Sequence, residues 1–95
     1  MLELVTTAKF RKDLKLAEKR GQDIKLLRQV VQTLLEEKEL DRKYKDHILH
    51  GEYEGCRECH IAPDWLLIYE TNEKEAVLVA MRTGTHSDLF CCKAA

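Results

Sequence analysis

The sequence contains no long uninterrupted apolar segment. Its longest apolar runs, such as the five residues 65–69, are far too short to span a bilayer. The first residues, 1–5, also lack the charged start and apolar stretch of a secretory signal. We therefore expect no membrane contact and a cytoplasmic location.

Internal repeats, low-complexity tracts and interdomain linkers are also absent, and proline occurs only once in 95 residues. A chain of this length makes one small domain. Its hydrophobic content of 44% excludes general disorder. We predict a single domain over residues 1–95, with a flexible tail over 91–95.

No strong charge of one sign is present, since the formal net charge is −1. The charge is nevertheless uneven: residues 1–50 carry 12 basic against 9 acidic side chains, and residues 51–95 carry 4 against 8. Basic residues clustered on one helix can contact phosphates, although a solvated helix face explains the same pattern. The candidate phosphate contacts are Lys9, Arg11, Lys12, Lys15 and Lys19.

The cysteines do not form a convincing metal or haem site. Cys56, Cys59 and His60 spell the C-x-x-C-H pattern of c-type haem attachment, but that attachment requires export. On a strand, the two cysteines would also point to opposite faces. We expect free thiols and no cofactor, and keep a metal- or haem-binding protein as an alternative.

The pattern of apolar residues predicts an α+β fold with two layers, in which an N-terminal strand and a helical hairpin pack on an antiparallel sheet. Thr6 or Thr7 and then Asp23 are the expected helix caps, and Gly21 is the expected stop between the helices. A polar loop over 40–55 carries His47 and His50. The predicted strands are 2–5, 56–62, 65–70 and 75–81.

Polar residues at the ends of these strands are expected to converge. On the strand 56–62, Glu58 and His60 share a face, and Asp64 follows in the turn, so its carboxylate is expected near His60. The last strand ends close to His86, and one helical turn after it would place His86 and Phe90 on the same side.

Three blocks of residues resemble YafQ-type toxins, which belong to the RelE/ParE superfamily of bacterial toxin–antitoxin systems. The blocks are 44–47, 57–65 and 82–86, the last followed by Leu89-Phe90. The resemblance covers about residues 1–90 and implies a RelE-like fold. The slightly acidic net charge departs from what is usual for a toxin that binds the ribosome.

The resemblance implies a ribosome-dependent endoribonuclease that cleaves mRNA and is neutralised by a co-expressed antitoxin. The expected partners are the ribosome, mRNA and an antitoxin of the ribbon–helix–helix type, with oligomers formed only through the antitoxin. The functional residues carried over by position are His47, Glu58, His60, Asp64, Arg82, His86 and Phe90.

These residues suit metal-independent cleavage of RNA through its own 2′-hydroxyl, because imidazole can accept and return a proton near neutral pH. We assign Asp64 with His60 to the base side and His86 to the acid side. His47 and Arg82 are expected to contact phosphate, with an Arg82–Glu58 pair as the structural alternative.

Phe90 has two alternative interpretations: it is expected either to stack on an RNA base or to be a packing residue. His50 is interpreted as a surface residue. The alternative within the same fold is a ParE-like toxin that binds DNA gyrase and cuts no RNA, and the three candidate catalytic residues argue against it.

Overall fold

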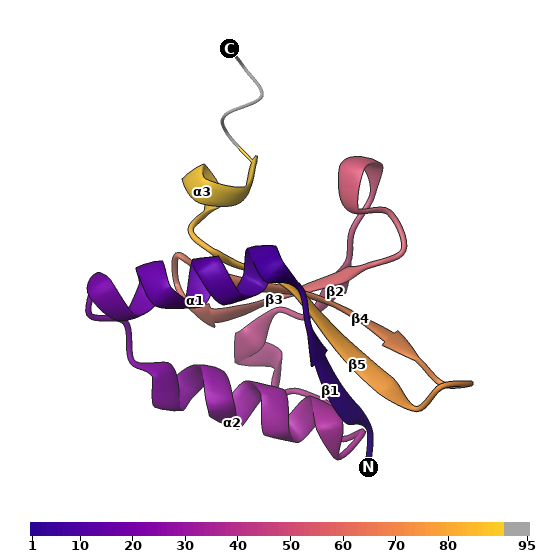
Figure 1. Ribbon diagram of the computed structural model, residues 1–95. Helices are drawn as coiled ribbons and strands as arrows, with labels where there is room; N and C mark the ends of the chain where they lie inside the picture. Colours follow the sequence, from indigo (N-terminus) through magenta and orange to yellow (C-terminus); the bar gives the residue numbers. More distant parts are fainter. Residues whose placement is uncertain (91–95) are drawn as a thin grey trace.

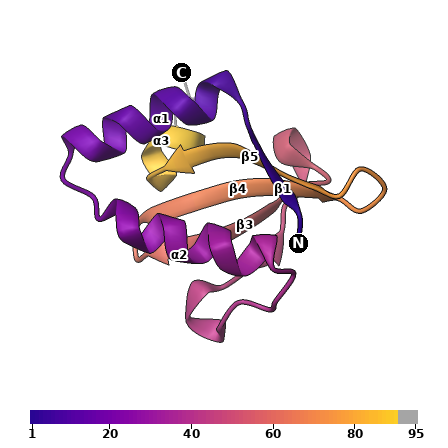
Figure 2. The ribbon, with the colours of Figure 1, turned by 60° about the horizontal axis from the view of Figure 1, so that its bottom comes forward.

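Five strands form one mixed sheet in the order β1-β5-β4-β3-β2, and two helices pack along one of its faces (Figures 1 and 2). The computed structural model describes residues 1–90. The predicted two-layer α+β fold is confirmed. The elements are β1 (Glu3–Thr6), α1 (Ala8–Lys19), α2 (Ile24–Leu35), the short 3₁₀ helix η1 (Arg42–Tyr44), β2 (His47–Ile48), the 3₁₀ helix η2 (Gly51–Tyr53), β3 (Arg57–Ala62), β4 (Trp65–Asn72), β5 (Val77–Gly84) and α3 (His86–Phe90).

The helical hairpin is built by the residues that the sequence indicated. The Thr7 hydroxyl accepts a hydrogen bond from the backbone N–H of Phe10 at 3.0 Å, and the Asp23 carboxylate accepts one from Lys25 N–H at 3.0 Å. Each satisfies an amide that the first helical turn leaves without a partner. Gly21 has a φ of 82°, which ends α1 and lets the chain turn into α2.

The first strand joins the sheet in parallel with β5, so the sheet is not purely antiparallel. The antiparallel prediction holds for β2 to β5. A parallel pair needs a long connection, which the intervening helices and strands provide. The Thr7 hydroxyl also donates to the Met81 carbonyl at 2.7 Å, which fixes the start of α1 against β5.

The core lies on both faces of the sheet. Between the sheet and helices α1 and α2, the larger cluster includes Phe10, Leu27, Trp65 and Leu67. A smaller cluster on the opposite face contains Cys56, Leu66, Ile68 and Leu89. Strand β4 is buried on both faces, as its continuous apolar run predicted. None of the helices within residues 1–90 is long and apolar enough to cross a membrane.

Some predicted boundaries were wrong. The segment 40–55 was expected to be a loop, but it forms η1, the short strand β2 and η2. The last strand was expected at 75–81 and runs instead from 77 to 84. The strand begins later than predicted because Ala76, with a φ of 56°, belongs to the turn. It ends later than predicted because Arg82, Thr83 and Gly84 continue to pair with β4. The predicted tail, 91–95, lies outside the described residues.

An ion pair ties α3 to the end of α1. Asp88 accepts hydrogen bonds from Arg20 at 2.6 and 3.3 Å, and from the backbone N–H of Thr85 at 3.0 Å. The Arg20 side chain, followed by the Thr85 backbone, lowers the pKa of Asp88. This contact holds the first turn of the helix that begins with His86.

Asp88→Asn should therefore lower the melting temperature at neutral pH. Because the folded-state pKa is depressed, this stability is present above the unfolded value of about 4 and is lost as the pH falls through the folded value. The pair is partly exposed, so the effect is modest. Melting curves of both proteins between pH 7 and pH 3 should converge at the acid end. Glu73→Gln, in the exposed turn after β4, serves as the control. A gap that stays constant with pH would contradict the prediction.

Candidate active site

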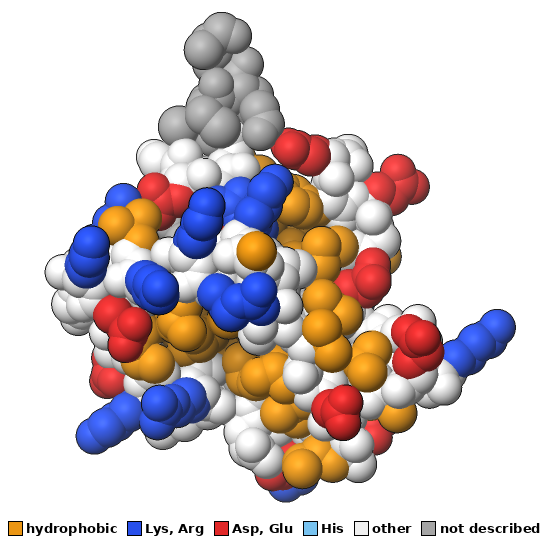
Figure 3. Space-filling view, in the orientation of Figure 1, with side chains coloured by type: hydrophobic (Ala, Val, Ile, Leu, Met, Phe, Trp, Pro, Cys, Tyr) orange, Lys and Arg blue, Asp and Glu red, His pale blue; other side chains and the backbone are white. Residues whose placement is uncertain are grey.

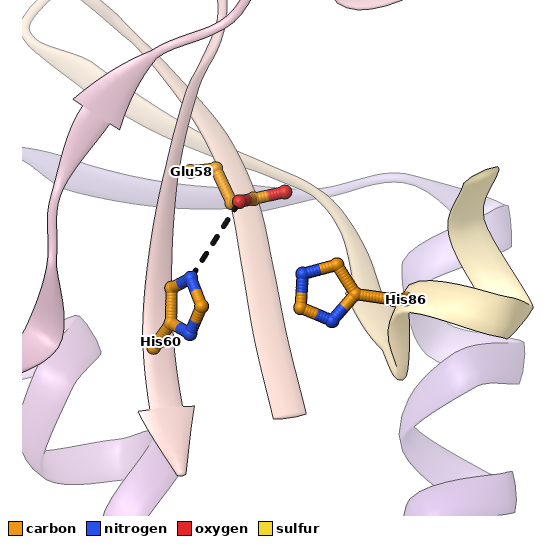
Figure 4. A group of neighbouring side chains, drawn as sticks. All are labelled: Glu58, His60 and His86. Atoms are coloured by element: carbon orange, nitrogen blue, oxygen red, sulfur yellow. Dashed lines mark ion pairs between the residues drawn. The ribbon is translucent and has the colours of Figure 1, made fainter. Parts of the chain in front are cut away.

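The candidate catalytic residues meet on the sheet face that α1 and α2 leave uncovered. Glu58 and His60 project from β3, and His86 approaches from the first residue of α3 (Figure 4). The ring centroids of His60 and His86 lie 5.7 Å apart, and those of His47 and His60 lie 6.5 Å apart. The structure thus brings together three of the four histidines.

Glu58 lies at the buried base of this cluster, with only 4% of its surface exposed. Its Oε1 atom is 3.3 Å from Nε2 of His47 and 3.9 Å from Nε2 of His60. Its Oε2 atom is buried and has no hydrogen-bond partner in the described residues. Burying a carboxylate is costly unless other groups compensate its charge. Glu58 therefore places negative charge beside two imidazoles that can carry protons.

His47 lies on β2, opposite Glu58 in the antiparallel register, rather than in a loop as predicted. Its Nδ1 atom is 2.7 Å from the Lys45 carbonyl oxygen. A carbonyl only accepts, so Nδ1 carries the hydrogen and Nε2 faces Glu58. The short strand is anchored by Asp46, which accepts hydrogen bonds from the Tyr69 hydroxyl at 2.6 Å and from the Arg57 guanidinium at 3.3 Å.

Asp64 pairs with His86, not with His60, so the expected pairing was wrong. Its Oδ1 atom accepts from Nδ1 of His86 at 2.9 Å and from the backbone N–H of the same residue at 3.2 Å. Strand β3 is irregular between His60 and Ala62, and the turn that follows carries Asp64 to the start of α3. The contacts with His86 lower the pKa of Asp64. Asp64 therefore stays a carboxylate and orients the His86 ring. Because this hydrogen bond uses Nδ1 of His86, the Nε2 atom of His86 can take part in proton transfer.

Arg82 pairs with Asp13 of α1, and not with Glu58. Its Nε and Nη2 atoms donate to the Asp13 carboxylate at 2.6 and 3.0 Å, and its Nη1 atom lies 3.5 Å from the Tyr53 hydroxyl. This bidentate pair, more than any other contact, raises the pKa of Arg82. Sequence reasoning missed Asp13, although an acidic residue among the basic residues of the first helix was a usable signal.

Phe90 lies beside His86, as predicted. The two ring centroids are 6.5 Å apart, and Phe90 also makes an edge contact with Tyr53 at 6.0 Å. The ring is 37% exposed, whereas its neighbour Leu89 is 1% exposed and belongs to the core. Leu89 is therefore the packing residue of α3, and Phe90 presents a ring next to the histidines. Sequence reasoning did not identify Tyr53.

The basic residues of α1 form an exposed surface on the outside of the molecule. Lysines and arginines gather along this helix in the space-filling view (Figure 3). The helix also carries two acidic residues: Asp13 lies on its inner side, where it pairs with Arg82, and Glu18 is exposed. Arg11 also donates to the Thr6 carbonyl at 2.9 Å. The candidate phosphate contacts Lys9, Arg11, Lys12, Lys15 and Lys19 are all exposed.

The two cysteines of the C-x-x-C-H pattern cannot act together. Cys59 is 0% exposed within the helix-side core, and Cys56 is 5% exposed within the cluster on the other face. Burial raises the pKa of Cys59 to about 12, so it remains a thiol. The haem alternative therefore has no site.

One metal-ligand set does occur within the described residues. The donor atoms of Glu58, His60 and His86 lie within 4.8 Å of one another. Imidazole and carboxylate together suit zinc or copper. Metal binding and proton transfer would use the same nitrogen lone pairs, so a bound metal would compete with acid–base chemistry at these residues.

A helical hairpin on a mixed sheet, with imidazoles and carboxylates on the open face, agrees with the RelE-like fold that the sequence resemblance predicts. The family model described as "Bacterial toxin of type II toxin-antitoxin system, YafQ" matches residues 2–91, and the chain belongs to this family.

Individual relatives agree in sequence and in structure. The mRNA interferase toxin YafQ of Escherichia coli K12 is 41% identical over 85 residues, which cover 88% of this chain and 90% of the relative. A metal-bound toxin from Helicobacter pylori is 49% identical, with a TM-score of 0.89, covering 95% of this chain and all of that one. YafQ in the E. coli DinJ–YafQ complex is 37% identical, with a TM-score of 0.86, covering 96% and 100%.

Proposed function

We propose that this protein is an endoribonuclease that cleaves mRNA in the decoding site of the ribosome and so stops translation. One observation carries the proposal: the ring centroids of His60 and His86 lie 5.7 Å apart on the sheet face that α1 and α2 leave uncovered, and each imidazole has a different carboxylate within 4 Å. Two groups that exchange protons on either side of a phosphate are what 2′-hydroxyl cleavage requires. The name of the E. coli relative supports the same reaction.

In the proposed mechanism, His60 removes the proton from the 2′-hydroxyl. The resulting oxygen attacks the adjacent phosphorus, and the bond from phosphorus to the 5′-oxygen breaks. His86 donates its Nε2 proton to that leaving oxygen, giving a 2′,3′-cyclic phosphate and a 5′-hydroxyl. Arg82 and His47 stabilise the negative charge on the phosphorus centre. Positioned acid–base groups supply about 10²–10⁴-fold each, and alignment by the ribosome supplies more.

His60, rather than Asp64, is the proposed base. The hydrogen bonds from His86 lower the pKa of Asp64, which makes this carboxylate a weak proton acceptor. Glu58 lies 3.9 Å from His60 and can balance the charge that His60 acquires with the proton. Asp64 accordingly serves the acid side, where it fixes the Nδ1–H form of His86.

We further propose that a co-expressed antitoxin of the ribbon–helix–helix type neutralises this chain. The E. coli relative is found in a complex with DinJ. Expression of the active protein alone should arrest growth, and the antitoxin from the adjacent reading frame should restore growth and co-purify. Harmless expression of active protein would count against this pairing.

The gyrase-binding alternative makes a different prediction. A toxin that acts by binding gyrase needs no pair of imidazoles for proton transfer. In this protein His60 lies near the buried carboxylate of Glu58, and His86 is hydrogen-bonded to the exposed carboxylate of Asp64. A gyrase supercoiling assay with the purified protein should show no inhibition. Inhibition by both the wild-type protein and the His86→Ala variant would favour the alternative.

Mapping RNA 5′ ends tests the proposed function. The protein is added to ribosomes stalled on a defined mRNA, to the same mRNA without ribosomes, and to both in the presence of a zinc- and copper-selective chelator that leaves Mg²⁺ in excess. We expect discrete cleavage in the decoding site, insensitivity to the chelator and little cutting without ribosomes. Intact mRNA on ribosomes would exclude the function, and loss of cleavage with the chelator would exclude the metal-independent mechanism.

The basic residues of α1 should govern affinity for the ribosome. If they contact ribosomal RNA, binding releases condensed counterions, so the association constant falls steeply with salt. Replacing Lys9, Lys12 and Lys15 with glutamine should weaken association and reduce the slope of log K against log salt by about 2–3. Cleavage of mRNA on saturated ribosomes should persist. An unchanged affinity and slope would show that these lysines only solvate the helix.

A further inference from the structure

A groove adjoins the histidine cluster at His60. This groove has a volume of about 410 Å³ and shares His60 with the active site, whereas neither His86 nor Phe90 lines it. Its other walls are Leu26, Lys43, Tyr44, Lys45, Ile61, Ala62 and Pro63.

The groove exists because β2 is short. That strand pairs only with Arg57 and Glu58, so the edge of β3 beyond them has no strand beside it. The 3₁₀ helix η1 lies there instead. Asp41 caps this turn by accepting from Lys43 N–H at 3.1 Å, and Lys45 closes it with a φ of 50°.

The charge of the groove is entirely basic. Lys43 and Lys45 line it, and no acidic residue does. The two nearest acids in sequence are occupied elsewhere, since Asp41 caps η1 and Asp46 binds Tyr69 and Arg57. The Lys43 ammonium lies 5.2 Å from the centre of the Tyr44 ring. Two cations beside an aromatic ring fit a nucleotide, because phosphates pair with ammonium groups and bases stack on aromatic faces.

We propose that this groove binds the nucleotides on the 5′ side of the bond that is cut, so that the RNA strand runs from η1 across the histidines towards α3. The inference rests on the proposed function. The 2′-hydroxyl belongs to the nucleotide on the 5′ side of the scissile phosphate, and the leaving oxygen belongs to the next nucleotide. With His60 at the 2′-hydroxyl and His86 at the leaving oxygen, the chain beyond His60 is the upstream one. Phe90, beyond His86, then meets the downstream base.

The test combines one charge-removing double variant with single phosphate changes in the mRNA. Lys43→Gln is made together with Lys45→Asn, because asparagine tolerates the positive φ at that position. Lys38→Gln with Lys74→Gln removes the same charge elsewhere and is the control. Ribosomes are programmed with mRNAs that carry one uncharged methylphosphonate, either directly upstream or directly downstream of the scissile phosphate. The toxin concentration for half-maximal single-turnover cleavage is measured for every combination.

For the wild type, the upstream methylphosphonate should raise the half-saturating concentration by about tenfold, the value of one charged hydrogen bond. The Lys43/Lys45 variant should show the same increase on unmodified mRNA and no further increase on the upstream-modified mRNA. Its response to the downstream change should match that of the wild type. The limiting rate and the melting temperature should be unchanged, and the control variant should behave like the wild type throughout.

Two results would overturn the polarity. One is additive loss from the variant and the upstream methylphosphonate, and the other is loss of the downstream response in the variant. If the variant has no effect on any substrate, the groove does not bind RNA, while cleavage by the wild type leaves the proposed function intact. If the wild type cuts no mRNA, the proposed function and this inference both fail.

Discussion

His86→Ala is expected to lower the single-turnover rate of mRNA cleavage by about 10²-fold or more. The leaving 5′-oxygen would then depart without a proton from the enzyme. The side chain is 55% exposed and is hydrogen-bonded to Asp64, which is 66% exposed, so the substitution empties no core position. The melting temperature should therefore stay close to that of the wild type. Rates are measured on saturated ribosomes, so that a change in affinity does not enter the comparison.

Two further variants locate the effect. His50→Ala changes an exposed histidine outside the cluster and should cut at the wild-type rate. Asp64→Asn keeps the shape of the side chain but removes the negative charge that holds Nδ1–H of His86, so it should reduce the rate by less than His86→Ala. In a double variant, Asp64→Asn should reduce the cleavage rate of His86→Ala little further, because Asp64 acts through the His86 ring. A wild-type rate for His86→Ala would remove this residue from the acid role.

Local signals in the sequence were enough to predict the helical hairpin and the meander. Thr7, Gly21 and Asp23 act within a few residues of their own positions, so their roles can be read without knowing the fold. The same holds for the buried run in β4 and for the neighbouring rings of His86 and Phe90, which are four residues apart. Short-range geometry fixes all of these features.

The pairings across the fold could not be predicted in this way. Asp64 was expected beside His60, four residues away, but the irregular end of β3 directs it to His86, 22 residues later. Arg82 pairs with Asp13 across 69 residues because α1 packs on β5. Alternation along a strand shows which residues share a face, but not what an element from elsewhere in the chain brings to that face. The parallel pairing of β1 with β5 could not be predicted for the same reason, since the two strands are far apart in the sequence.

These long-range contacts also explain how a small domain holds its site. His47, His60 and His86 come from three different elements, β2, β3 and α3, and ion pairs hold β2 and α3 in place. Asp46 fixes β2 through Tyr69 and Arg57, while Asp88 fixes α3 through Arg20. Glu58 is part of the sheet itself and is buried. The distances between the imidazoles therefore depend on side chains that do no chemistry themselves.

Phe90→Ala is expected to weaken cleavage about 5- to 150-fold, with little change in melting temperature. Stacking of a base on an aromatic ring is worth about 1–3 kcal/mol by alanine substitution, and the Phe90 ring is 37% exposed beside His86. Phe90→Trp should keep much of the activity, because a larger aromatic face can still stack. Both rates are measured at saturating and at low ribosome concentrations, since a stacking contact can act on binding and on alignment.

Leu89→Ala is the matched comparison, because the neighbouring side chain is 1% exposed within the core. Removing it should cost about 2–5 kcal/mol of folding free energy and lower the melting temperature sharply. If Phe90 were a packing residue, its alanine variant would behave like Leu89→Ala, and the oversized tryptophan would also lower the melting temperature. A large drop in melting temperature for Phe90→Ala with unchanged cleavage would exclude Phe90 from the site. The opposite pattern, with activity lost and stability kept, places its ring against the mRNA base on the side of the leaving oxygen.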